Sequence, residues 1–252
     1  MDFCVLGSGS SGNSFLISDK ENSFLIDAGF SYKEINRRLE KIGIEINEIK
    51  AVFITHEHID HIKGIEKLYK EGLNIVMTKK TFENSYLKIK PMFIEKNQNF
   101  DFFNFNIFAF NQEHDAADPV GYKISDKKKN KTISIMTDLG SINKENIKAI
   151  KESDAIALES NHDIDMLING PYPYNLKQRI LSNKGHLSNY DSALFLKEYS
   201  TDKLKNIFLS HLSKINNKVD LVYQTFEKIL EKKKLEKVKI SNQYSPTEII
   251  TL

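Results

Sequence analysis

The 252-residue chain lacks the features that mark secreted and membrane proteins. Its single cysteine, Cys4, excludes an intrachain disulfide and is typical of a reducing compartment. No apolar run approaches the roughly 18 residues that a membrane-spanning helix needs. The apolar stretch at residues 3–7 is also too short for a signal peptide. We therefore expect a cytoplasmic protein with no membrane partner.

A strong charge of either sign is also missing. The formal net charge is +2, tryptophan is absent, and nearly all basic residues are lysines. Bulk electrostatics therefore do not indicate a nucleic-acid-binding protein. The lysine runs at residues 126–131 and 231–237 are better explained by a polar turn and a solvated helix end. With 40% hydrophobic and 28% charged residues and no break in composition, the sequence predicts one globular domain over residues 1–252.

Short apolar runs bounded by turn residues alternate with stretches of helical periodicity. Strands are predicted at 3–7, 14–18, 23–27, 51–55, 74–78, 103–110, 120–125, 131–137, 154–160 and 206–211. Helices are predicted at 32–43, 61–72, 143–151, 174–182, 188–199 and 217–234. This order favours a layered α/β domain over a helical bundle. Polar residues with metal-binding chemistry follow several of the strands directly, so we expect them to meet at one edge.

The densest group of such residues is the segment THEHIDH at 55–61. Three histidines and an aspartate would be costly to bury without partners. A tight loop after the strand at 51–55 can aim His56 and His58 one way, and Asp60 and His61 another. Imidazole and carboxylate together suit Zn²⁺ and related divalent metals. A chance surface cluster is the weaker alternative.

The HxHxDH pattern after an apolar strand resembles the signature of the metallo-β-lactamase superfamily. Further segments resemble the other motifs of that superfamily in the same order: LIDAG (25–29), QEHDAADPVGY (112–122), MTDLG (136–140) and LSHLS (209–213). The resemblance covers essentially the whole chain. It implies a four-layer αββα sandwich with a dinuclear metal site at the edge of the sheets.

The resemblance also implies a set of ligands for two divalent ions, which could be zinc, manganese or iron. One ion would be held by His56, His58 and His114, the other by Asp60, His61 and His211, with Asp138 between them. Asp27 would order the histidine loop without binding metal. Taken alone, His114 could be a loop residue, Asp138 a helix cap and His211 a satisfied strand-end histidine. Their order beside HxHxDH favours the ligand interpretation.

Two metals about 3.5–4 Å apart lower the pKa of a bridging water and clamp the attacked group, so hydrolysis by a metal-bridging hydroxide is implied. The complete second site of Asp60, His61 and Asp138 resembles the nuclease and phosphodiesterase branches of the superfamily. The fold alone does not choose the substrate. An acyl hydrolase acting on a thioester or lactone is the first alternative. A non-catalytic, metal-bound regulator of a cell-wall signalling system is the second.

The segment GSGSSGNS at 7–14 could bring backbone N–H groups close to an anion, with Ser8, Ser10, Ser11 and Asn13 as candidate substrate-binding residues. By itself, a plain hairpin turn explains it equally well. At this position it resembles the opening of a bacterial subgroup, the WalJ/VicX/YycJ-type hydrolases. That resemblance implies a DNA exonuclease-like phosphodiesterase, and hence nucleic acid, with DNA favoured, as the partner.

Three further candidates lie outside the implied ligand set. Glu159 follows the strand at 154–160, and His162 lies three residues later, where we expect the first turn of a helix. Both could act at the site, or could simply cap a helix. His186, in SNKGHLSN (182–189), is predicted to contact a phosphate oxygen or to protonate the leaving group. A structural histidine before a helix is the alternative.

Overall fold

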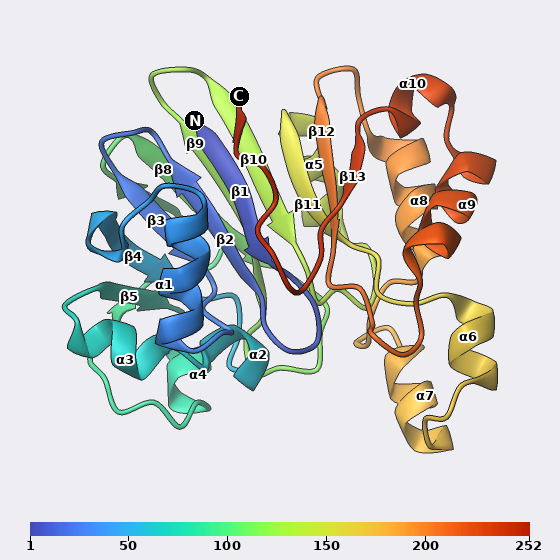
Figure 1. Ribbon diagram of the computed structural model, residues 1–252, viewed down its shortest axis with the longest axis horizontal. Coiled ribbons are helices and arrows are strands. Elements are labelled where there is room, and N and C mark those ends of the chain that lie inside the picture. Colours follow the sequence, from blue (N-terminus) through green and yellow to red (C-terminus); the bar gives the residue numbers. More distant parts are fainter.

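The computed structural model describes residues 1–252 and contains two seven-stranded sheets packed face to face (Figure 1). The first sheet has the order β14-β1-β2-β3-β4-β5-β6 and the second β13-β12-β11-β10-β9-β8-β7. The first comprises β1 (Asp2–Gly7), β2 (Ser14–Ser18), β3 (Ser23–Ile26), β4 (Ile49–Phe53), β5 (Asn74–Met77), β6 (Met92–Phe93) and β14 (Ile250–Thr251). The second comprises β7 (Asn99–Phe102), β8 (Phe105–Asn111), β9 (Val120–Asp126), β10 (Lys131–Met136), β11 (Ala155–Glu159), β12 (Asn206–Ser210) and β13 (Val238–Ile240).

The helices form the two outer layers. Beside the first sheet lie α1 (Tyr32–Lys41), the 3-10 helix η1 (Ile46–Glu48), α2 (Ile59–Ile62), α3 (Ile65–Lys70) and α4 (Lys79–Glu83). Along the second lie α5 (Lys144–Glu152), α6 (Ile164–Asn169), α7 (Tyr174–Ile180), α8 (Asn189–Tyr199), α9 (Val219–Ile229) and α10 (Lys232–Leu235). The predicted αββα architecture is confirmed. None of these helices combines the length and the apolar character needed to cross a bilayer.

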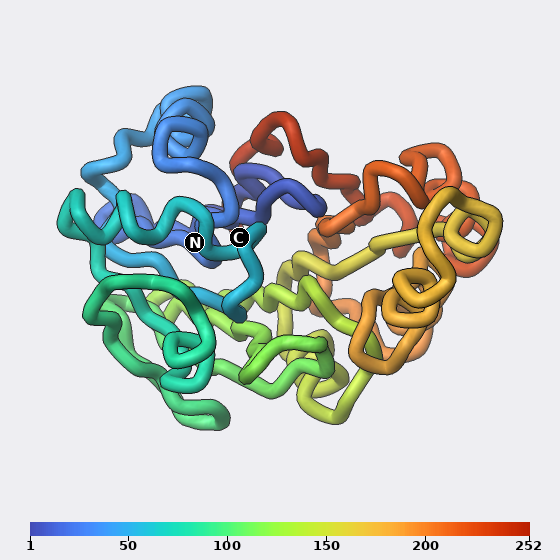
Figure 2. The backbone as a smooth tube through the Cα atoms, turned by 90° about the horizontal axis from the view of Figure 1, so that it is seen from below, coloured from blue at the N-terminus to red at the C-terminus, as the bar shows by residue number.

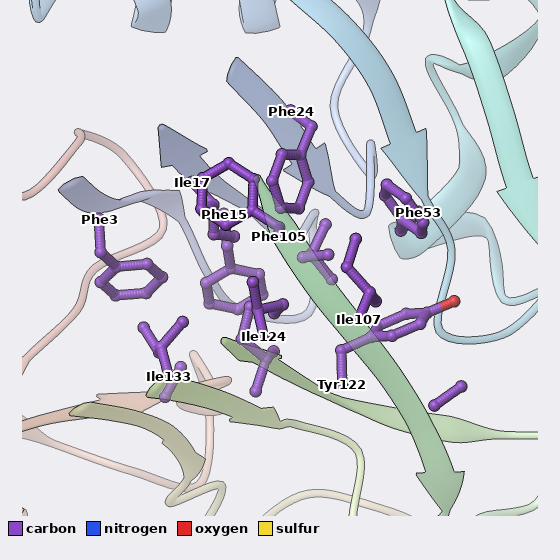
Figure 3. Packing of buried hydrophobic residues seen from close by; sticks show 14 of the residues in the cluster. Phe3, Phe15, Ile17, Phe24, Phe53, Phe105, Ile107, Tyr122, Ile124 and Ile133 are labelled. Carbon is purple, nitrogen blue, oxygen red and sulfur yellow. The ribbon is translucent and has the colours of Figure 1, made fainter. Parts of the chain in front are cut away.

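The central core lies between the sheets and takes alternate residues from their strands. It contains 22 buried residues, including Phe3, Phe24 and Phe53 from the first sheet and Tyr122 and Phe208 from the second (Figure 3). Each large apolar side chain buried in this way contributes about 1.5–3 kcal/mol. The opposite faces of the two sheets pack on separate apolar clusters with α1 and α3 on one side, and with α5, α8 and α9 on the other. Both faces of each sheet are therefore buried, which explains why many strands read as continuous apolar runs.

Two of the predicted helices are interrupted in the structure. The pattern at 61–72 divides into α2 and α3 at Gly64, whose N–H donates to the carbonyl of Ala28 at 2.8 Å. A Cβ at Gly64 would lie 2.5 Å from the carbonyl oxygen of Phe30, so only glycine allows this approach. The pattern at 217–234 divides into α9 and α10 at Leu230, whose backbone is extended and whose side chain is buried. In both places, tertiary packing overrides helical periodicity.

The sheets repeat one plan, which determines where their strands end. In the first sheet β3, β4, β5 and β6 run parallel, and in the second β10, β11, β12 and β13 run parallel. The carboxyl ends of these strands meet at the lower edge of the molecule in Figure 1, the side seen in Figure 2. Asp27, Asp138 and His211 follow three of the strands with φ between +56° and +59°, a conformation that turns the chain sharply at the edge.

Candidate metal centre

The histidine loop leaves β4 and is held from behind by Asp27. The Asp27 carboxylate accepts hydrogen bonds from Thr55 N (2.8 Å), Thr55 Oγ1 (2.9 Å) and His61 Nδ1 (2.7 Å). Gly29, two residues after Asp27, allows the chain to touch the loop, because a Cβ there would lie 1.6 Å from the carbonyl oxygen of Asp60. Asp27 thus fixes His61 with Nδ1 protonated and Nε2 directed away from Asp27.

His56, His58 and His114 form the first group of possible ligands, with donor atoms within 4.8 Å of one another. His114 comes from the segment after β8, and its Nδ1 lies 3.1 Å from the carbonyl oxygen of Gly185. Its Nε2 lies 3.3 Å from His58 Nδ1. His56 Nε2 is buried and has no hydrogen-bond partner. An unpaired buried ring nitrogen aimed at two further imidazoles is the arrangement that a metal ion satisfies.

Asp60, His61, Asp138 and His211 form the second group. Asp138 follows β10, and its Oδ2 lies 3.0 Å from His61 Nε2. His211 follows β12, and its Nε2 lies 3.5 Å from Asp60 Oδ2 without hydrogen-bond geometry. Asp138 Oδ1 also lies 3.8 Å from His114 Nε2, so Asp138 faces both groups. The residues that the sequence separates by 150 positions therefore converge at one edge.

Glu159, at the end of β11, is a buried carboxylate whose oxygens are already occupied. Its Oε1 accepts hydrogen bonds from His186 Nδ1 (2.8 Å) and His211 Nδ1 (2.7 Å). Its Oε2 accepts from the backbone N–H groups of Leu139 (2.9 Å) and Leu187 (3.0 Å). Burial raises the pKa of Glu159, but the two histidines outweigh it and lower the pKa to about 2. Glu159 is therefore an anion that orients two imidazoles.

The charges of the cluster are strongly coupled in the metal-free chain. Burial opposes the charged form of His61, yet Asp138, Asp27 and Asp60 outweigh it and raise its pKa well above the usual value. Burial likewise opposes ionisation of Asp138, but His211 and His61 hold its pKa well below the usual value. His56, without a carboxylate of its own, has its pKa lowered by burial and by His61. Burial also opposes the charged form of His211, but Asp138, Asp60 and Glu159 raise its pKa well above the usual value. The carboxylates thus favour positive charge at the places where a metal ion would supply it.

The residues present fit divalent metal ions. Buried imidazole nitrogens and carboxylate oxygens face one another, His56 Nε2 is unpaired, and the backs of His61 and His211 are fixed by Asp27 and Glu159. Such carboxylate–histidine pairs set the tautomer and raise the basicity of ligating imidazoles. The donor set of nitrogen and oxygen suits zinc, manganese or iron, and by itself does not choose between them.

A pocket of about 210 Å³ opens over the cluster, and only three of its 14 lining residues are hydrophobic. It is smaller than the roughly 300–1,000 Å³ of sites that enclose a whole small molecule. Tyr172, Arg179 and Ser10 line its rim, and Arg179 pairs with Asp115, the neighbour of His114. Sequence reasoning missed Tyr172, Arg179 and Asp115. One feature of the sequence could have pointed to Arg179: it is one of only three arginines, and the other two, Arg37 and Arg38, lie far from it in the chain.

Four of the residues expected to act at the site are placed differently. Ser8 and Asn13 are buried, so they do not offer their side chains to a substrate. Ser8 Oγ accepts from His211 N at 2.9 Å, and Asn13 Nδ2 lies 3.1 Å from His61 Nε2, so both support the metal cluster. Ser11 is exposed and outside the pocket, where its N–H donates to Gln243. Of the four candidate residues at 7–14, Ser10 alone lines the pocket.

His162 is also placed differently, because it precedes α6 rather than lying in its first turn. Asp163 is the cap of α6, and its side chain accepts from Met166 N. His162 is buried, does not line the pocket, and has its pKa lowered to about 4 by burial. His186, by contrast, lines the pocket beside His114 and His211. Ser188, two residues after it, is the N-cap of α8 and accepts from Asp191 N.

Two facing sheets covered by helices, with clustered histidines and carboxylates at the strand ends, define a metallo-hydrolase architecture. The chain belongs to the beta-lactamase superfamily, since the model of the beta-lactamase superfamily domain matches residues 22–206. It is 34% identical over 240 residues to the exodeoxyribonuclease YycJ of Bacillus anthracis, which covers 92% of this chain and 90% of that protein. It is 36% identical over 232 residues to the exodeoxyribonuclease WalJ of Streptococcus pneumoniae serotype 2, which covers 88% of this chain and 86% of that protein. The resemblance to WalJ/YycJ-type proteins is confirmed.

Solved structures of the same fold are more distant in sequence. The metallo-beta-lactamase fold protein YhfI of Bacillus subtilis superposes with a TM-score of 0.73 at 17% identity and covers 98% of both chains. The short form of human tRNase Z superposes with a TM-score of 0.67 at 18% identity and covers 100% of both. These likenesses establish the fold over the whole chain.

Proposed function

We propose that this chain is a metal-dependent phosphodiesterase that degrades DNA as an exonuclease. Two relatives that match most of the chain are named exodeoxyribonucleases, which supports cleavage of DNA over RNA. The observation that carries the proposal is the polar pocket over the metal cluster, with Arg179 at its rim. A small polar pocket admits one phosphate group and leaves the rest of the substrate outside, as a polymer requires. We also propose the cytoplasm as the place of action, which the use of a single, unpaired cysteine supports.

We further propose two divalent ions, zinc or manganese, in the two groups of ligands. His56, His58 and His114 hold the first, Asp60, His61 and His211 hold the second, and Asp138 reaches both. When bound, such a pair of ions lowers the pKa of a water between them and stabilises charge on the attacked phosphate. His186 stays outside this set because the two groups are complete without it, although Glu159 holds its Nδ1 as it holds that of His211.

The other residues of the pocket then position the substrate and move a proton. Glu159 fixes His186 through Nδ1, so that Nε2 is the nitrogen left to donate a proton to the leaving oxygen. Arg179, held by Asp115, keeps guanidinium N–H groups for a phosphate oxygen. Tyr172 lies at the rim with Arg179 and offers a ring on which a terminal base can stack.

The acyl-hydrolase alternative lacks a specific supporting observation. A thioester or lactone carries an apolar chain that needs an apolar groove, whereas the hydrophobic residues of this pocket are Tyr172, Leu176 and Ile180 alone. The regulatory alternative would be favoured by a missing ligand, but each position implied by the superfamily's motifs has a residue able to bind metal.

A direct test compares substrates on one preparation of known metal content. The purified protein, loaded with Zn²⁺ or Mn²⁺, is assayed on 5′-labelled single- and double-stranded DNA and RNA, and on a p-nitrophenyl thioester. We expect stepwise shortening of DNA and no thioester hydrolysis. Thioester hydrolysis without cleavage of any nucleic acid would overturn the proposal in favour of the acyl hydrolase. An Arg179→Lys variant, which keeps the charge but loses the planar fork, should raise KM for DNA by about 10-fold.

A further inference from the structure

A second cleft of about 240 Å³ adjoins the metal pocket, and Ser8 from the segment at 7–14 is among its lining residues. Ser213 lines both hollows, so the two are neighbours. The second cleft is bounded by the segment after His211 and by the chain that follows β13, which passes the turn between β1 and β2 (Figure 1). Three of the exposed residues that line it are Lys214, Lys218 and Tyr244. The proposed reaction at the metal cluster uses none of these three side chains.

The walls of this cleft are held in place by hydrogen bonds between distant segments. Ser8 N–H donates to the carbonyl of Asn242 (3.2 Å), and Ser11 N–H donates to the side chain of Gln243 (3.1 Å). Arg38, stacked on Phe30, donates to the carbonyl of Gln243 at 2.8 Å. The segment carrying Tyr244 is therefore fixed beside the loop that supports His211 and Asp60.

The charge of the cleft distinguishes it from the other hollows of the surface. Lys214 and Lys218 are exposed, form no ion pair, and share the cleft with no carboxylate. Three other hollows that contain lysines each also contain an aspartate or a glutamate. Lys218 precedes the first turn of α9, where a cation is unfavourable to the helix dipole, so helix stability does not explain it.

Tyr244 adds an aromatic surface next to this positive charge. The residue is 62% exposed and its ring makes no aromatic pair, and its backbone N–H donates to Asn242 Oδ1 at 2.8 Å. Free lysines beside an exposed ring on a rigid backbone form the combination that binds single-stranded nucleic acid, through phosphate contacts and base stacking.

We propose that the substrate strand runs from the metal pocket across Ser213 into this cleft, as single-stranded nucleic acid. Lys214 and Lys218 contact the phosphates next to the cleaved one, and a base stacks on Tyr244. The inference rests on the proposed phosphodiesterase function and adds the path of the polymer. A substrate too short to extend beyond the metal pocket gains no binding energy from the cleft, whereas a longer strand gains binding energy there.

The test measures KM for single-stranded DNA of increasing length, from a dinucleotide to a 20-mer, at several salt concentrations. The double variant Lys214→Ala/Lys218→Ala should raise KM for the 20-mer by roughly 10-fold, and by much less for the dinucleotide. The slope of log KM against log salt should fall by about 1.4, since each phosphate contact to a single strand contributes about 0.7. Tyr244→Ala should also raise KM for the 20-mer, and Tyr244→Phe should restore it.

A matched control is Lys228→Ala/Lys232→Ala, which removes the same charge from exposed positions in α9 and α10. It should leave KM and the salt slope unchanged. An equal effect of both double variants would reduce the result to net charge and overturn the inference. The inference would also be overturned if the wild-type protein cleaves DNA and the cleft variants show the same KM as the wild type. A wild-type protein that hydrolyses neither DNA nor bis-p-nitrophenyl phosphate would instead contradict the proposed function, and the inference with it.

Discussion

The two sheets deliver their halves of the metal cluster in different ways. Each places one buried carboxylate behind a histidine: Asp27 behind His61 at the end of β3, and Glu159 behind His211 at the end of β11. The first sheet then presents its donors in one short loop, residues 56–61, after β4. The second presents His114, Asp138 and His211 after three separate strands, β8, β10 and β12, with Glu159 on the strand between the last two.

This difference shows which part of the fold holds the ligands that each sheet contributes. A six-residue loop is largely set by local geometry and by the three hydrogen bonds that Asp27 accepts. The separate strand ends are set by the register of β10, β11 and β12, where Met136 pairs with Leu158 and Leu158 with Leu209. The first half depends on one loop, whereas the second depends on the whole sheet and its core.

The largest effect is expected from substitutions in the histidine loop at residues 56–61. Asp60→Asn and His58→Ala each remove a proposed ligand of one metal while leaving the sheets intact. We expect DNA cleavage to fall by on the order of 1,000-fold or more, because the clamp needs both ions. Activity is measured with labelled DNA and bound metal by elemental analysis, with circular dichroism to confirm the fold. Full activity in either variant would remove the dinuclear assignment.

The next largest effect is expected at His186, whose ring is held by Glu159 of the second sheet. His186→Ala should lower kcat for DNA by about 100-fold, with the metal content almost unchanged. The loss should be smaller on bis-p-nitrophenyl phosphate, because p-nitrophenolate leaves without needing a proton. Loss of metal from this variant would instead identify His186 as a ligand.

A paired comparison of the two supporting carboxylates has a smaller expected effect. Asp27→Asn and Glu159→Gln keep shape but remove the charge that orients His61 and His211. Each should weaken metal affinity by roughly 10–100-fold, and Glu159→Gln should lower kcat further because it also releases His186. Metal titrations and DNA assays on both variants measure this. Identical kcat losses in the two would show that Glu159 acts through His211 alone.

The smallest effect is expected on the reactivity of Cys4, which lies in β1 of the first sheet and reports whether that sheet opens when metal is removed. Burial raises the pKa of the Cys4 thiol to about 11, so about one thiol in a thousand is ionised at pH 8. Because the sheet is held by its apolar core, removal of metal by a chelator should leave Cys4 unreactive towards a thiol reagent. Unfolding in denaturant provides the positive control. Rapid labelling after chelation alone would show that the metals stabilise the whole sheet.

Much of the fold could be predicted from local sequence. Apolar runs such as residues 131–137 and 206–211 became β10 and β12, and the capped pattern at 143–151 became α5. The edge strands β6, β7, β13 and β14 were missed. Three of them have only two or three residues, which carry no periodicity of their own, and β7 has no buried residue. The pairing of β14 with β1 joins the two ends of the chain, and nothing local indicates it.

The sequence by itself predicted metal binding at the HxHxDH loop, because three histidines and an aspartate in six residues have few other physical uses. It also supplied the order of the remaining candidate ligands, through their resemblance to a family. The tertiary structure alone decided which side chains are open to a substrate. It buried Ser8, Asn13 and His162, and it brought Arg179 and Tyr172 to the rim. Exposure depends on which distant segments pack together, and that information lies in the register of the two sheets.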